Sequence, residues 1–372
     1  MRTCPLAAAV ASFLLCAATV SYADEGGPIF TFGAATSYTF DINQPDNQVT
    51  DENRKLYANG WSEESFNIDL VQLGISGTRG PVSYGAKLDF GDWTRSIQDN
   101  VNGDFALQEM FFTVDTPVGL VTAGRMPTPF GYEVLEPWAD ANISRSRAWY
   151  FQSISHDGVA LSGRLGSASL MAAIINGFHL NNIGADNPDD EYGVLASAGI
   201  PIGEATARLS AVYSDEKDSV RYVEVNGVLA GSHERYRYGL EGTYLNGDGH
   251  GNGTPTDPVP QDSWMWDLTS YGGATFFEKW STDFRLSYTD QKGTNGNYFT
   301  RNRDKIVSFT ATGGYEIVDG VVFRVEYRID SSDNPIFDDN NSSLSLVGPV
   351  GQSDLVNVVQ CQLMWTPATG SD

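Results

Sequence analysis

One turn-rich stretch, residues 127–157, carries three acidic residues followed by two basic ones, before Asp157 at its end. They are Glu133, Glu136, Asp140, Arg145 and Arg147. Side chains of both charge signs, held across a narrow aqueous passage, create a field that acts on charged solutes without making or breaking a bond. The residue types in this stretch therefore indicate electrostatic selection, and the wall that faces the stretch has to come from elsewhere in the chain.

The wall candidates lie in segments where polar and apolar residues alternate, and we expect them on the polar face. They are Arg125, Glu109, Arg164, Arg208, Arg285, Arg324, Glu326 and Arg328. Two interpretations stay open. An acidic stretch facing a basic wall would give a transverse field, whereas arginines paired across strands would only hold the stretch against the wall. The same contacts can do both.

Catalytic and metal chemistry have weak support in the sequence. Among the four histidines, only His156, next to Asp157 and close to Ser153 and Ser155, resembles a nucleophile–base set, and it lacks a strained nucleophile turn. The Gly-spaced oxygens of residues 246–257 offer a calcium alternative, but their spacing matches no EF-hand. We therefore predict no enzyme activity, no metal site and no cofactor. The net charge of −24 argues against nucleic acid as a partner.

Segments with a period of two are predicted to position these residues. In residues 29–42 one face is apolar and aromatic, and the other is small or polar. The apolar face holds Phe30, Phe32, Ala34, Tyr38, Phe40 and Ile42. The alternation recurs in residues 82–90, 284–289, 307–317 and 322–330. Such runs are longer than the ~5–6 residues of a typical soluble strand and match a tilted membrane strand of ~9–11 residues.

The composition of the polar face favours a membrane barrel over a soluble sandwich. That face carries Ser, Thr, Gly and paired Arg and Glu, as a water-filled lumen does, and the apolar face suits lipid. After the leader, no apolar run approaches the ~18 residues that a membrane helix needs. Because lipid offers no partner for the amides of an open sheet edge, the sheet has to close. We predict an all-β, closed antiparallel transmembrane β-barrel.

Connections that alternate between tight turns and long polar joints predict about 16 strands with the long loops outside. This count includes residues 219–225 as a short strand that turns at Asn226-Gly227, a hairpin signal. The last strand is predicted at residues 355–365. The wall strand before 127–157 should end at Pro127-Thr128-Pro129. A stretch this long and aromatic is expected to fold into the barrel mouth as a constriction loop.

Residues 1–23 have the features of a signal peptide. Arg2 gives a positive start, an apolar run follows, and a small-x-small cleavage site ends at Ala23, which leaves residues 24–372 as the barrel. Cys4 and Cys16 lie in the leader, so only Cys361 would remain and no internal disulfide could form. The predicted location is the outer membrane of a Gram-negative-type cell.

The run from Thr122 to Glu133, TAGRMPTPFGYE, resembles the putative β-barrel porin-2 (OmpL-like) outer-membrane family, in which a strand with a Gly-basic step runs into a Thr-Pro-Phe-Gly turn. Residues 144–146, 156–159 and 176–177 are similar to the continuation of that family's loop and strands. The specific likeness covers residues 122–159. It implies an outer-membrane porin-like barrel and names no solute. Such barrels commonly finish on an aromatic residue, whereas residues 366–372 follow Trp365 here.

These observations together predict a channel for passive diffusion of small hydrophilic solutes or ions. The alternative is a non-conducting barrel whose extracellular loops bind a surface, a partner or a ligand. The expected neighbours are outer-membrane lipid and lipopolysaccharide, and a homo-oligomer stays open. Solute identity and the choice between cations and anions do not follow from the sequence.

Overall fold

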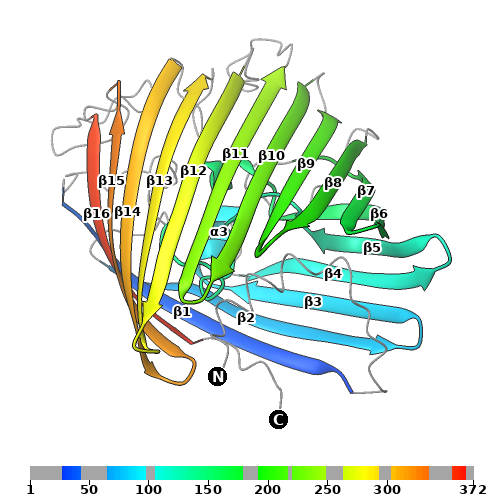
Figure 1. Ribbon diagram of the computed structural model, residues 1–372, viewed down its shortest axis with the longest axis horizontal. Helices are drawn as coiled ribbons and strands as arrows, with labels where there is room; N and C mark the ends of the chain where they lie inside the picture. The colour runs from blue at the N-terminus through cyan, green and yellow to red at the C-terminus, as the bar shows by residue number, and fades with distance from the viewer. Residues whose placement is uncertain are drawn as a thin grey trace.

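Sixteen antiparallel strands close into one barrel, each paired with its neighbours in sequence (Figure 1). The computed structural model describes residues 27–42, 65–97, 105–178, 192–216, 220–248, 263–292, 303–334 and 354–365. The strands are β1 (Ile29–Asp41), β2 (Ser65–Arg79), β3 (Val82–Phe90), β4 (Phe105–Thr116), β5 (Gly119–Pro127), β6 (Ser155–Leu165), β7 (Ala168–Ile175), β8 (Gly193–Ile202), β9 (Ala205–Glu216), β10 (Val220–His233), β11 (Tyr236–Asp248), β12 (Ser263–Phe276), β13 (Trp280–Lys292), β14 (Arg303–Val318), β15 (Val321–Ser332) and β16 (Leu355–Trp365). The predicted fold class and strand number are confirmed.

The barrel closes between its first and last strands. β1 and β16 pair in register from Ala34 opposite Trp365 to Asp41 opposite Val358. The aromatic rings of Phe32 and Trp365 lie 5.2 Å apart across this seam. Closure leaves every strand with two partners, so the sheet presents no row of unpaired backbone groups to lipid. The final strand spans the predicted residues.

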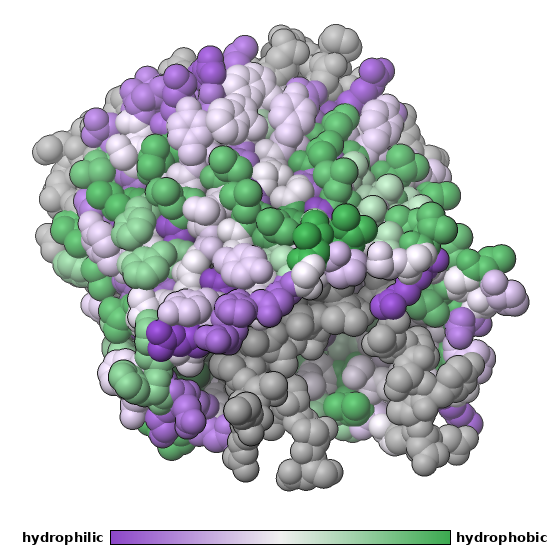
Figure 2. All heavy atoms as spheres, in the orientation of Figure 1, coloured by the Kyte–Doolittle hydropathy of each residue, from purple (hydrophilic) through white to green (hydrophobic). Residues whose placement is uncertain are grey.

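The two faces of the wall differ in the predicted way. On β13 the inward Arg285, Ser287 and Thr289 are buried, while Phe284 and Leu286 are exposed on the outside. The same division holds along β1, β14 and β15. Figure 2 shows green hydrophobic side chains spread over the outward face of the strands. The apolar face is therefore the one available to lipid, and the polar face surrounds the lumen.

The connections alternate in length as predicted. At one end the turns after β2, β4, β6, β8, β10, β12 and β14 contain no more than three residues each. At the other end the connections are long, except for residues 217–219 between β9 and β10. Within the described ranges the helical elements are α3 (Asp92–Ile97), after β3, and the single 3-10 turn η1 (Ala148–Phe151). None of the described helices has the length and apolar character needed to cross a membrane.

The predicted turn at Asn226-Gly227 is wrong, although the strand count is right. β10 runs straight through both residues and turns at Glu234-Arg235, where Glu234 takes a φ of 51°. Asn226 stays in the strand because its side chain faces the lumen and bonds there to Glu241 and Thr243. The predicted signal peptide and most of the calcium alternative at 246–257 lie outside the described residues.

Candidate functional site: the loop inside the barrel

The chain between β5 and β6, residues 128–154, lies inside the barrel, as predicted. Its first turn is fixed to the wall on the side of β9 and β10. The Ser210 hydroxyl donates to the Pro129 carbonyl at 2.8 Å, and the Gly131 amide donates to the Asn226 side chain at 3.1 Å. Arg208 also donates to the Gly131 carbonyl. Most of the loop is buried, including every residue from 142 to 154. We call residues 128–154 the inner loop.

Arg145 holds the inner loop in shape. Its guanidinium donates to the backbone carbonyls of Val134, Leu135 and Ile143, at 2.9, 3.0 and 3.1 Å. It also forms an ion pair with Asp140 at 2.7 Å. The guanidinium carbon lies 4.6 Å from the ring centre of Trp93 in α3. These contacts fold the loop upon itself, so Arg145 and Asp140 act within the loop and not across the lumen.

The wall of β13 and β15 binds the middle of the inner loop. Arg285 pairs with Glu133 and donates to the Ser144 carbonyl at 2.6 Å. Glu326 accepts hydrogen bonds from the amides of Ile143 and Ser144, at 2.6 and 3.0 Å. Charged groups that bond to backbone in this way are among the stronger hydrogen bonds. This side of the wall anchors the loop.

The remaining arginines of this wall also bond to the loop. Arg324 donates to the Asp140 carbonyl at 2.6 Å and to the Pro137 carbonyl at 3.1 Å. Arg328 donates to the Arg145 carbonyl at 2.7 Å. In the other direction, Arg147 of the loop donates to the Gln291 side chain at 3.0 Å. The wall arginines therefore bond to loop carbonyls more than to loop carboxylates. This pattern favours the interpretation in which the arginines hold the loop against the wall.

Glu136 reaches the opposite wall, formed by β2, β3 and β4. It accepts from Lys87 at 2.7 Å, and Lys87 also bonds to Glu109 at 2.9 Å. Gln72 and Gln108 donate to the same Glu136 oxygen, at 3.3 and 3.2 Å. Burial alone would raise the pKa of Glu136, but the charge of Lys87, together with hydrogen bonds from Lys87, the backbone and Gln72, holds that pKa below its ordinary value. The inner loop thus spans the lumen from one wall to the other.

Two loop aromatics lie flat on bare backbone of the wall. A Cβ added to Gly33 of β1 would overlap the ring of Trp138, and one added to Gly239 of β11 would overlap the ring of Tyr132. Tyr132 is also stacked on Tyr271, with ring centres 4.0 Å apart. Glycine is required at these two positions because the rings occupy the space of a side chain.

Gly239→Ala should destabilise the protein by about 1–3 kcal/mol, because the added methyl group overlaps a ring that Tyr271 prevents from moving away. Denaturant unfolding of the folded barrel measures the shift in midpoint. Gly242→Ala, in the same strand, is the matched control: no atom lies within 4 Å of its added Cβ. Equal midpoints for the two variants would contradict the packing described here.

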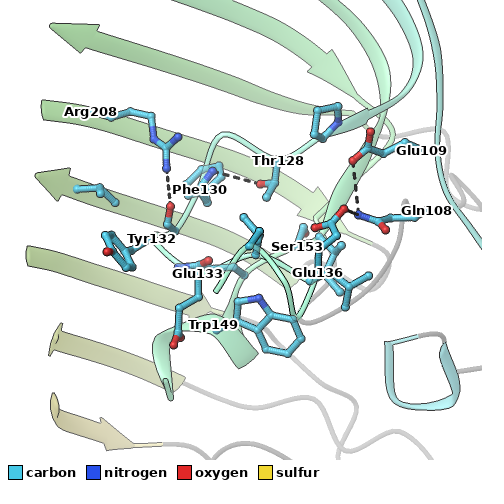
Figure 3. Close-up of a pocket in the computed structure, with 18 of the residues that line it drawn as sticks. Gln108, Glu109, Thr128, Phe130, Tyr132, Glu133, Glu136, Trp149, Ser153 and Arg208 are labelled. Carbon is cyan, nitrogen blue, oxygen red and sulfur yellow. Dashed lines mark hydrogen bonds between the residues drawn. The ribbon is translucent and has the colours of Figure 1, made fainter. Parts of the chain in front are cut away.

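Beside the inner loop remains a cavity of about 60 Å³ (Figure 3). Gln108 and Glu109 of β4 and Glu136 of the loop lie together at one side of the cavity, and Arg208 of β9 lies at the other. Phe130 is drawn between the two groups in Figure 3, and Tyr132 lies on the side of Arg208. The cavity is therefore bordered by carboxylates on one side and a guanidinium on the other.

Two of the predicted wall arginines, Arg125 and Arg164, do not contact the inner loop from the lumen wall. Arg125 is on the outward face, opposite the exposed Met110 in register, and forms an ion pair with Asp157 at 2.7 Å. The inward position next to it is taken by Met126, which packs in the apolar cluster under the loop. Arg164 has the inward parity but is exposed, one residue before the end of β6 at the short-turn side.

His156 and Asp157 lie on opposite faces of β6. His156 points inward, with its Nε2 at 3.1 Å from the Thr128 hydroxyl, whereas Asp157 points outward to Arg125. The carboxylate therefore cannot orient the imidazole. Across the described residues, no group of three or more His, Cys, Asp or Glu side chains could hold a metal ion.

The polar residues that surround Glu136 were not predicted from the sequence. Lys87 and Asp89 fall on the polar face of the predicted segment 82–90, so their orientation was available from the alternation. Gln72 and Gln108 carried no charge signal, and only the folded barrel brings them to the loop.

A closed 16-strand barrel with a polar interior and a long loop folded into its lumen has the fold of an outer-membrane porin. The chain is similar to OmpT of Vibrio cholerae, with a TM-score of 0.60 and 12% identity over 92% of this chain and 99% of that chain. It is also similar to DcaP, an outer membrane channel of Acinetobacter baumannii, with a TM-score of 0.60 and 13% identity over 91% and 96%. An anion-selective porin from Comamonas acidovorans gives a TM-score of 0.62 and 10% identity over 91% and 99%.

The family of the chain follows from its sequence. The family model "Putative beta-barrel porin-2, OmpL-like" matches residues 30–351, and the chain belongs to this family. The resemblance read from residues 122–159 is thereby confirmed. No curated protein matches the sequence. The family and the fold place the protein among the porin-like barrels of the outer membrane.

Proposed function

We propose that the protein is a non-enzymatic channel through which small hydrophilic solutes or ions diffuse passively across the outer membrane. The polar lumen of the closed wall, with a cavity left between the inner loop and that wall, is the observation that carries this proposal. Gln108, Glu109 and Arg208 supply polar and charged groups to a border that is otherwise mostly apolar, and these groups suit hydrated solutes. The apolar outward face suits contact with membrane lipid and lipopolysaccharide.

A homo-oligomer is the remaining part of this proposal. OmpT of Vibrio cholerae has been solved in a trimer form. In this chain, the outward ion pair of Arg125 and Asp157 supports a subunit contact. Both side chains are less than a quarter exposed although they lie on the apolar face of the barrel. A neighbouring copy would cover these charges from lipid.

Single-channel recording from the purified barrel in a planar lipid bilayer tests the proposal. We expect steady conductance steps whose size grows with salt concentration, because a water-filled path conducts by diffusion. Insertions that later close in several equal steps would indicate several pores in one assembly. A folded barrel that conducts nothing would contradict the channel, and would favour the alternative in which the extracellular loops bind a surface, a partner or a ligand.

A further inference from the structure

Two carboxylates border one side of the cavity, a third is buried behind them, and a single ammonium group lies among the three. The carboxylates belong to Asp89 of β3, Glu109 of β4 and Glu136 of the inner loop, and the ammonium group belongs to Lys87. Lys87 bonds to one oxygen each of Glu109 and Glu136, at 2.9 and 2.7 Å. Within the described residues, the hydrogen-bond donor to Asp89 is the neutral Gln72 amide, at 2.9 Å. We call these three residues the acidic side of the cavity.

Two oxygens of the acidic side have no hydrogen-bond partner within the described part of the chain. They are Oε2 of Glu136 and Oδ2 of Asp89. Glu136 is 3% exposed and Asp89 is 0% exposed, so bulk water does not reach these oxygens freely. Leaving a buried charged oxygen without a partner is costly. The arrangement therefore favours a further positive charge beside the two free oxygens.

The acidic side is continuous with the path proposed for solutes. Glu109 and Glu136 both border the cavity, and the Gln72 amide that holds Asp89 is shared with Glu136. Across the cavity Arg208 presents the opposite charge, and it already donates to the Gly131 carbonyl. Positive ions are thus attracted to one side of the opening and kept from the other.

We propose that the acidic side binds a small monovalent cation in passage and makes the channel prefer cations to anions. This inference rests on the proposed channel function and names the class of ion that the channel favours. The cation is held by surplus negative charge and not by chelation, because the described residues contain no cluster fit to ligate a metal ion. A monovalent ion that is weakly held can also leave, which conduction requires.

The reversal potential across a potassium chloride gradient in planar bilayers measures the permeability ratio of K⁺ to Cl⁻. For the unaltered protein we expect a ratio above 1. Asp89→Asn and Glu109→Gln should each lower the ratio by about twofold, the Coulomb effect of one unit charge about 10 Å from an ion in water. Both substitutions keep the size of the side chain.

Glu316→Gln is the matched control, because it removes one acid near the short-turn end of β14, where it accepts from the Gly320 amide and takes no part in the acidic side. Its ratio should equal that of the unaltered protein. A ratio at or below 1 in the unaltered protein, or an unchanged ratio in both test variants, would overturn the inference while leaving the channel intact. A barrel that conducts neither ion would overturn the channel function and this inference together.

Discussion

Arg285→Met should release the inner loop from the wall at β13 and raise the single-channel conductance. Arg285 and Glu133 form an ion pair whose side chains are 1% and 3% exposed, and Arg285 also binds the Ser144 carbonyl. Removing the guanidinium leaves the Glu133 carboxylate buried without its counter-charge, a loss of about 3–5 kcal/mol for such pairs. The strand ladder does not depend on Arg285, so we expect the loop to move while the barrel stays folded. Conductance at fixed salt measures the wider opening.

Two further variants separate loop release from general damage. Adding Glu133→Gln to Arg285→Met removes the unpaired charge, so the double variant should recover part of the lost stability and of the original conductance. Arg237→Met is the matched control, since the partners of Arg237 are Asp283 and Thr275, which both lie on wall strands. Conductance that is unchanged in Arg285→Met, or raised equally in Arg237→Met, would refute the anchoring role.

Leu286→Arg should lower the stability of the barrel in lipid by about 2–4 kcal/mol, the cost of a charge in the middle of the lipid face of a barrel. Leu286 lies near the centre of β13 and is 51% exposed on the apolar outward face. An arginine there has no polar partner and must draw water or headgroups into the hydrocarbon. Urea unfolding of the protein reconstituted in phospholipid vesicles measures the change in free energy of unfolding.

Phe277→Arg provides the comparison at the edge of the membrane. Phe277 lies in the turn after β12 and is 91% exposed, so the same substitution should cost only about 0–1 kcal/mol there. If Leu286→Arg and Phe277→Arg destabilise equally, the outward face does not meet lipid, and the barrel assignment of the two faces is wrong.

The alternation of residue types was sufficient to predict the wall of the barrel. Side chains point to opposite sides of a strand with a period of two, so residues such as Phe284 and Arg285 had to meet different surroundings wherever the strand lay. Strand ends followed from turn formers, as at Pro127. The turn predicted at Asn226-Gly227 is absent because the Asn226 side chain bonds inside the lumen to Glu241 and Thr243, which are distant in the sequence.

The inner loop was predicted in place and extent, but not in its contacts. Glu133, Asp140 and Arg145 were expected to face a charged wall, yet Asp140 pairs with Arg145 inside the loop and only Glu133 meets an arginine of β13. A stretch without periodicity gives no rule for which way its side chains point. The partners of Glu136 were missed for this reason.

The sequence by itself determined that the chain is a membrane barrel. One face of each strand meets lipid and the other meets water, and the alternation of apolar and polar residues reflects this difference. Only the tertiary structure decided which charges meet. Lys87 and Glu136 are far apart in the chain and touch because the barrel closes around the loop. The orientation of Arg125 also depends on the tertiary structure. Met126 points inward into the apolar cluster, so the adjacent Arg125 points outward. Long-range pairing is a property of the closed wall and of the space that its side chains leave inside.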